Sequence, residues 1–235
     1  MPHHKLNSED EFYKVARSFP EVHLFFGYGE RAQYADVEEL MDALSPSLKA
    51  IQSRCAGAPF LAVYGGDKAV KERPDLGWLM KRIQDEYNCK LAAVQSAGEP
   101  DEHSDFCFVA KQQFETLKKM NSAGQEEEFQ QVLYGGTRNG VPVGGARYYL
   151  GPEFIASTHG AAPLLKSVFV LGGGGIALEE IQYADQKGVT WVYVPSRARH
   201  EEAYRSRYGP VHEWVSGYVI AFLSLFHSFG GNPVC

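Results

Sequence analysis

Short, continuous runs of apolar residues recur along the chain, and most are followed by a turn signal and then a helical pattern. Runs of Val, Leu, Phe and Ala without polar interruption are typical of strands buried on both faces, as in a parallel sheet. The predicted strands are VHLFF (22–26), FLAVY (60–64), KLAAVQ (90–95), DFCFVAK (105–111), SVFVL (167–171) and VTWVYV (189–194).

Between these strands, three segments repeat their apolar residues with a helical period. They are 34–54, with an interruption expected at Pro46, then 75–87, and finally 177–188, which ends on a glycine cap. Alternation of strands and helices predicts right-handed crossovers. We therefore expect a doubly wound, mainly parallel α/β sheet with helices on both faces, Rossmann-like, in a single domain over 1–235.

The region 97–166 breaks this alternation and is predicted to be an excursion over the ligand site rather than a second domain. Its polar part, FETLKKMNSAGQEEEFQQ, is predicted to be an exposed helix with a turn at Gly124. The dipeptide Asn139-Gly140, flanked by short runs, predicts a β-hairpin.

The tail VHEWVSGYVIAFLSLFHSF is the most apolar part of the chain. Its uninterrupted stretch of apolar or small residues, 215–226, is about half as long as the ~20 residues needed to span a bilayer. We therefore expect no membrane span, but a C-terminal apolar helix at about 211–229 that is buried or forms a subunit contact.

Composition narrows the classes of partner. The formal net charge of -6 argues against nucleic-acid binding, which depends on neutralising phosphates. The start, MPHHKLNSEDEFYK, has no apolar signal region, so a cytoplasmic location is expected.

Cys89 and Cys107 lie in or beside apolar runs and are predicted to be buried free thiols. His103 and His200 have no partner at metal-ligand spacing, so we predict no metal site.

Glycines follow three of the predicted strands. In an open α/β sheet, ligands bind beyond the carboxyl ends of the strands, and glycine turns there expose backbone N–H groups that suit phosphate. The pattern predicts a small anionic ligand, most simply a nucleotide such as AMP. The predicted binding residues are Gly27 and Gly29, Gly65 and Gly66, and Gly172, Gly173, Gly174 and Gly175.

The order of these motifs resembles the LOG-like family, also labelled lysine decarboxylase-like. Its known members include cytokinin-activating nucleoside 5′-monophosphate phosphoribohydrolases. The matching stretches are FFGYGERAQY (25–34), YGGD (64–67) with LGWLM (76–80), KLAAVQS (90–96) and LGGGGIALE (171–179), the last against the signature PGGxGTxxE. The resemblance implies a Rossmann-like nucleotide-binding protein that forms a homodimer and uses no separate cofactor.

The resemblance also implies roles for particular residues. The signature glycines that hold the phosphate fall on Gly172, Gly173 and Gly175, and the glutamate that acts near the ribose falls on Glu179. Leu171 stands in place of the signature proline and Ile176 in place of its threonine.

An arginine of the family is also missing. The stretch that should carry this substrate-binding residue, GPEFIASTHGAAPLLK (151–166), contains none. Arg138 or Arg147, on the predicted hairpin, is expected to replace it. We name Glu179 and Arg147 as the catalytic candidates.

Three functions remain open at this stage. The first is hydrolysis of the N-glycosidic bond of a nucleoside 5′-monophosphate, in which a carboxylate stabilises an oxocarbenium-like state and helps to activate water. The second is a non-catalytic nucleotide-binding or sensing module. The third is an NADP-dependent oxidoreductase, since Gly172-x-Gly174-x-x-Ala177 fits a dinucleotide fingerprint and Arg197 follows the next strand.

Overall fold

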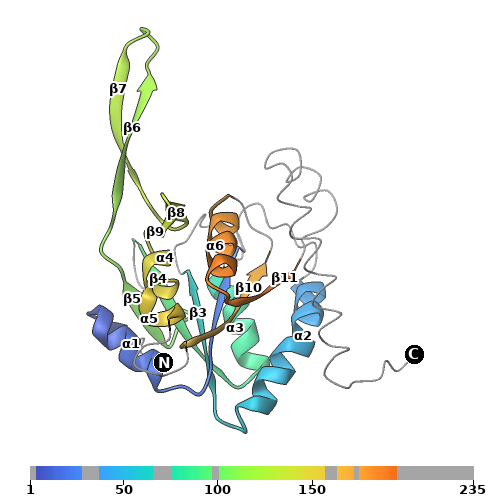
Figure 1. Cartoon of the computed structure of the whole chain (residues 1–235). Helices are drawn as coiled ribbons and strands as arrows, with labels where there is room; N and C mark the ends of the chain where they lie inside the picture. Colours follow the sequence, from blue (N-terminus) through green and yellow to red (C-terminus); the bar gives the residue numbers. More distant parts are fainter. Residues whose placement is uncertain are drawn as a thin grey trace.

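A seven-stranded sheet forms the centre of the protein (Figure 1). The computed structural model describes residues 4–27, 37–65, 76–96, 101–156, 163–171 and 175–194. Every neighbouring pair of strands in the sheet is parallel, which confirms the predicted α/β class with a Rossmann-like sheet. The order across the sheet is β1 (His4–Leu6), β5 (Phe106–Val109), β4 (Cys89–Gln95), β3 (Phe60–Gly65), β2 (Val22–Phe26), β10 (Leu165–Leu171) and β11 (Thr190–Val194).

The central strands are buried on both faces, as their continuous apolar runs predict. All five residues of β2 are buried. Phe25 of β2 lies beside Phe169 of β10, with stacked rings whose centroids are 4.7 Å apart. The predicted strands therefore all form, most of them within one or two residues of their predicted bounds.

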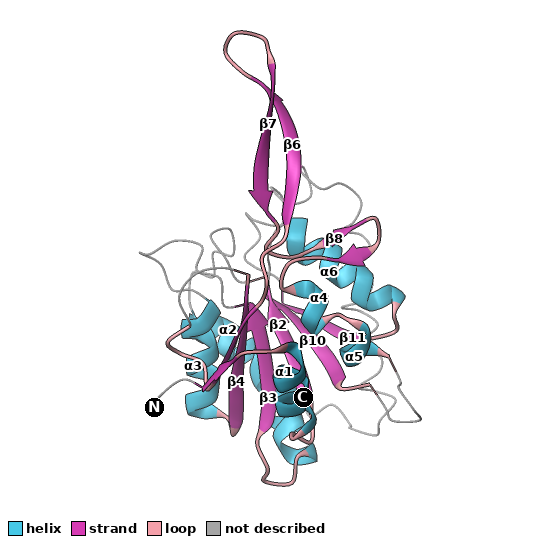
Figure 2. Cartoon of the chain, turned by 90° about the vertical axis from the view of Figure 1, so that its left-hand side faces the viewer, coloured by secondary structure: helices cyan, strands magenta, loops and turns pink. Residues whose placement is uncertain are grey.

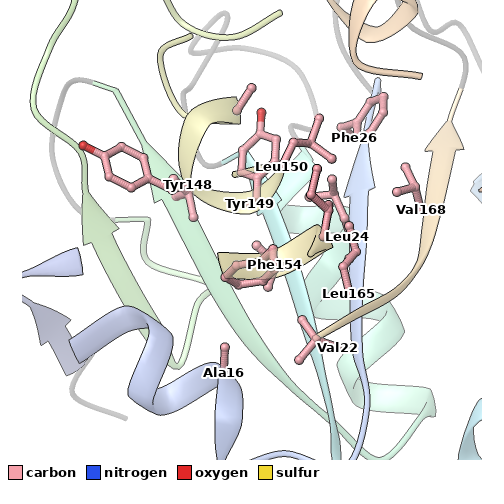
Figure 3. Close-up of a cluster of buried hydrophobic side chains, with 14 of the residues drawn as sticks. Ala16, Val22, Leu24, Phe26, Tyr148, Tyr149, Leu150, Phe154, Leu165 and Val168 are labelled. Carbon is pink, nitrogen blue, oxygen red and sulfur yellow. The ribbon is translucent and has the colours of Figure 1, made fainter. Parts of the chain in front are cut away.

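Helices cover both faces of the sheet (Figure 1). On one face, a single apolar cluster joins one set of alternating residues of β2 and β10 to α1 (Glu9–Arg17), α4 (Ala146–Tyr149), α5 (Pro152–Ile155) and α6 (Gly175–Gln186). Figure 3 shows part of this cluster. On the other face, a second cluster joins the alternate residues of the same strands to α2 (Val37–Arg54) and α3 (Leu76–Glu86).

The helix α2 runs without a break through Pro46, so the predicted interruption there is wrong. A proline inside a helix costs about 3 kcal/mol, while each fully buried leucine contributes about 1.5–3 kcal/mol. Leu40, Leu44 and Leu48 of α2 are almost fully buried on either side of the proline, and Pro46 itself is exposed. Burial of this apolar face outweighs the lost backbone hydrogen bond.

The excursion contains a long antiparallel hairpin formed by β6 (Phe114–Met120) and β7 (Glu126–Val132), which we call the arm. The predicted exposed helix in this segment is therefore wrong, although the turn at Gly124 is confirmed by its φ of 76°. The segment forms strands because its residues pair across the hairpin, as Leu117 does opposite Phe129, and not with neighbours one helical turn away. Figures 1 and 2 show the arm extending away from the body of the molecule.

The second hairpin of the excursion, β8 (Thr137–Arg138) with β9 (Val141–Pro142), confirms the prediction from Asn139-Gly140. Both turn residues have positive φ, 52° and 73°, as a two-residue turn of this type requires. The predicted C-terminal helix at 211–229 lies outside the described residues. Within the described ranges, no helix combines the length and the apolar character needed to cross a membrane.

Candidate functional site

The strand order reverses between β2 and β10. From β2, the chain builds the sheet in one direction through β3, β4 and β5, whereas β10 and β11 lie on the other side of β2. In open α/β sheets, ligands bind in the crevice beyond the carboxyl ends of the strands at such a reversal. The carboxyl ends of β2 and β10 therefore define the candidate site.

Several predicted glycines lie at this edge of the sheet. Gly27 directly follows β2 and has a φ of 94°, a conformation that residues with a side chain rarely adopt. Gly65 is the last residue of β3, and Gly175 is the first residue of α6. The other predicted glycines, Gly29, Gly66 and Gly172–Gly174, lie outside the described residues.

Glu180 of α6 binds the start of the second hairpin. Its Oε1 accepts hydrogen bonds from the backbone N–H of Gly136 at 2.9 Å and from the hydroxyl of Tyr149 at 3.0 Å. The residue is 2% exposed. This burial raises the pKa of the Glu180 carboxyl to about 7; the two hydrogen bonds oppose the shift and the nearby Glu179 carboxylate adds to it.

Glu179 binds the next residues of the same segment. Its Oε2 accepts the backbone N–H of Thr137 at 2.7 Å and lies 3.6 Å from Nη1 of Arg138. The side chains of Glu179 and Arg138 are 40% and 42% exposed, so both contact solvent. We call Glu179, Glu180 and the segment 135–138 the carboxylate clamp.

Both positions of the clamp that face the carboxylates are glycine. A Cβ on Gly135 would lie 2.6 Å from Oε1 of Glu180, and a Cβ on Gly136 would lie 2.5 Å from Oε2 of Glu179. Gly136 also has a φ of 84°. The two glycines therefore allow the backbone to approach α6 closely enough for both carboxylates to accept N–H groups.

Arg138 also connects the clamp to the arm, since its Nε lies 3.2 Å from Oε2 of Glu115 on β6. Arg147, the other arginine considered from sequence, has different contacts. Its Nη2 donates to the carbonyl of Lys111 at 3.1 Å and to the hydroxyl of Tyr148, and its guanidinium lies over the Tyr148 ring. Arg138 is thus the arginine that the structure brings to Glu179.

Sequence reasoning missed Glu180, Tyr149 and the pair Gly135–Gly136 as parts of this site. The adjacent glycines were a signal of close backbone approach, but the chain element that approaches them lies 44 residues away. Glu180 follows Glu179 directly in the stretch ALEEIQ, and no sequence feature indicates which of the two carboxyl groups is buried.

The cysteines and the other residue types that bind metals were also considered as site candidates from sequence. Cys89 and Cys107 are buried, as predicted. Cys107 donates to the side-chain oxygen of Gln95, at the end of β4. In the described ranges, no three His, Cys, Asp or Glu side chains come together as a metal site would require.

The parallel sheet, its helices on both faces and the reversal of strand order define a Rossmann-like α/β domain. No family model matches the chain, and no curated protein matches it. Among solved structures it is similar to two of the molybdenum cofactor carrier protein from Chlamydomonas reinhardtii. Both are 13% identical over 88% of this chain and 98% of theirs, with TM-scores of 0.43 and 0.39.

Proposed function

We propose that the protein is a LOG-like binding protein for a small phosphate-bearing ligand, most simply a nucleoside monophosphate. The observation that carries the proposal is the reversal of strand order between β2 and β10, with a glycine at the carboxyl end of β2 and another at the start of α6. The first backbone N–H groups of a helix have no partner within it, and the helix dipole favours an anion there.

Arg138 supports an anionic ligand in this proposal. Its guanidinium is half-exposed beside α6, and arginine forms bidentate hydrogen bonds with phosphate. Its Nε donates to Glu115, and its Nη1 donates to the carbonyl of Thr137 at 2.9 Å and lies 3.6 Å from Glu179. Its Nη2 is therefore the nitrogen that can donate to a ligand. Arg138 lies beside Glu179 of α6, whereas Arg147 contacts Lys111 and Tyr148 instead, so we assign the phosphate contact to Arg138.

A hydrolase is the second candidate, and the exposed pair Glu179–Arg138 favours it. A carboxylate beside the ribose would stabilise the oxocarbenium-like state of glycosidic cleavage and help to activate water, while the arginine would hold the phosphate. In this reading Glu179 is the catalytic residue and the glycine turn holds the substrate.

The test combines a binding screen with an assay for products. The panel contains AMP and other nucleoside monophosphates, ADP-ribose, NAD, NADP and the molybdenum cofactor, and each ligand that binds is then assayed by chromatography for released base. A ligand at a hundredfold its dissociation constant stabilises the folded state by about 2.7 kcal/mol, which a thermal-shift assay detects. Release of base identifies the hydrolase, and binding without release identifies a sensing or carrier module. A preference for NADP contradicts the proposal.

Variants assign the residues. Arg138→Ala should weaken monophosphate binding about 10- to 100-fold, the value of a charged hydrogen bond. Arg17→Ala is the matched control, because Arg17, the last residue of α1, forms a similarly exposed ion pair with Glu153. Glu179→Gln should leave binding intact and abolish base release. If Arg147→Ala rather than Arg138→Ala weakens binding, the phosphate contact belongs to Arg147.

A further inference from the structure

Among the residues that the structure describes, the backbone along both edges of the arm has no partner strand. In the described residues, β6 and β7 pair only with each other. A two-stranded hairpin is marginally stable in water, and its open edges are templates for another strand. Two of the most exposed large apolar side chains of the described residues, Phe114 at 54% and Met120 at 67%, lie at the two ends of β6.

The hydrogen-bond pattern shows which residues of β6 face its open edge. The backbone N–H of Leu133 donates to the carbonyl of Gln113 at 2.9 Å, immediately before β6. Antiparallel pairs alternate between bonded and non-bonded residues, so the odd-numbered residues of β6 bond to β7. The even-numbered residues, including Thr116 and Lys118, therefore direct their N–H and C=O groups away from β7.

The sequence of β6 is complementary to itself when two copies lie antiparallel about Leu117. In that register, Glu115 lies opposite Lys119 of the partner subunit, and Lys119 lies opposite Glu115 of the partner subunit. Phe114 meets Met120 of the partner subunit, so the two exposed apolar ends cover each other. Thr116 lies opposite Lys118 of the partner subunit, and both are residues whose backbone groups face the open edge.

Neighbouring registers lack this complementarity. Centring the pair on Lys118 places two lysine side chains opposite each other, and centring it on Thr116 places Glu115 opposite Leu117 of the partner subunit. The edge of β7 is also unsuitable, because Glu126, Glu127 and Glu128 contribute three carboxylates and the strand has no cation. Like charges directly opposite in a sheet are destabilising, whereas opposite charges and apolar pairs stabilise it.

We propose that two copies of this chain associate through their arms, by antiparallel pairing of β6 with β6 about Leu117, to form a four-stranded sheet with β7 at each outer edge. The occupant of the open edge is thus a second copy. Seven residues a side is fewer than the roughly 20–30 of a standard interface, so the association is weak and depends on concentration.

The test is sedimentation equilibrium of the full chain over a range of concentrations, with charge variants. Glu115→Lys alone and Lys119→Glu alone each place like charges opposite each other twice per dimer, so each variant should remain monomeric. An equimolar mixture restores both opposite-charge pairs and should associate as strongly as the unaltered chain. A dimer that persists in both single variants, or a mixture that stays monomeric, overturns the proposal.

Two proline variants provide a second test, and both leave the Glu115 and Lys119 charges at the interface unchanged. Lys118→Pro removes an N–H at the open edge of β6 without removing a bond to β7, and should abolish association. Glu128→Pro makes the equivalent change at the open edge of β7 and should leave the dimer intact. Equal effects of both prolines, or of neither, contradict pairing through β6.

Discussion

Two adjacent glutamates of α6 have opposite environments. Glu179 is half-exposed and lies beside a guanidinium, whereas Glu180 is buried and accepts hydrogen bonds from uncharged donors. Sequence could place both on the first turns of a helix after a glycine-rich stretch. It could not distinguish them, because the difference comes from Gly136 and Tyr149, which only the folded chain brings into contact with Glu180.

Glu180 should make stability depend on pH. Its pKa is about 7 in the folded protein and 4.5 by default, so the folded state holds the extra proton between these values. Stability from this group is present below pH 4.5 and is lost as pH rises through 7, with a total of about 3 kcal/mol.

The variant Glu180→Gln, which cannot ionise, should therefore gain stability relative to the unaltered protein as pH rises from 4.5 to 7. Urea unfolding at several pH values measures this difference. A difference that stays constant over the interval would show that Glu180 ionises normally.

At the scale of the elements, the predictable parts are those whose sequence pattern matches their burial. The strands of the sheet are continuous apolar runs, and both of their faces are covered. The arm was missed because its stability depends on pairs such as Leu117 with Phe129, which no local period indicates. The strand β1 and the helix α1 were also not predicted; β1 has only three residues, and α1 begins at a Ser8 cap whose side chain accepts the N–H of Glu11.

A substitution of Pro46 tests whether burial of the apolar face of α2 outweighs the cost of a proline inside the helix. Because the helix continues through it, Pro46→Ala adds a backbone donor and removes a steric conflict, although alanine makes the unfolded chain less restricted. We expect a net gain in the free energy of unfolding of about 1–2 kcal/mol. Denaturant unfolding measures it, with Ser47→Ala as the control in the same turn. No gain would mean that the helix is distorted enough to accommodate proline without cost.

At the scale of the whole molecule, a second buried titratable group lies at the amino-terminal edge of the sheet. His23 of β2 is fully buried; its Nδ1 lies 2.8 Å from the hydroxyl of Ser167 and its Nε2 lies 3.0 Å from Glu21. Burial lowers the pKa of His23 from 6.5 to about 4, while the Glu21 carboxylate opposes the shift. Arg54 in turn pairs with Glu21 through two hydrogen bonds of 2.8 Å.

The histidine should offset Glu180. Between pH 4 and 6.5, the unfolded chain binds a proton at His23 that the folded protein does not, so stability from this group rises with pH. The contributions of His23 and Glu180 then cancel between about pH 4.5 and 6.5. We expect NMR titration to find the His23 ring neutral at pH 5; a ring already charged at pH 6 would contradict this account.

The arm joins the body of the molecule at a narrow base. Gln113 and Leu133 are hydrogen-bonded neighbours, so the chain leaves the body and returns to it at nearly one point. The arm is therefore a module: its length and composition can vary without redirecting the strands whose carboxyl ends define the candidate site. Glu115, through its contact with Arg138, is the exception, because it is where a change in the arm reaches the carboxylate clamp.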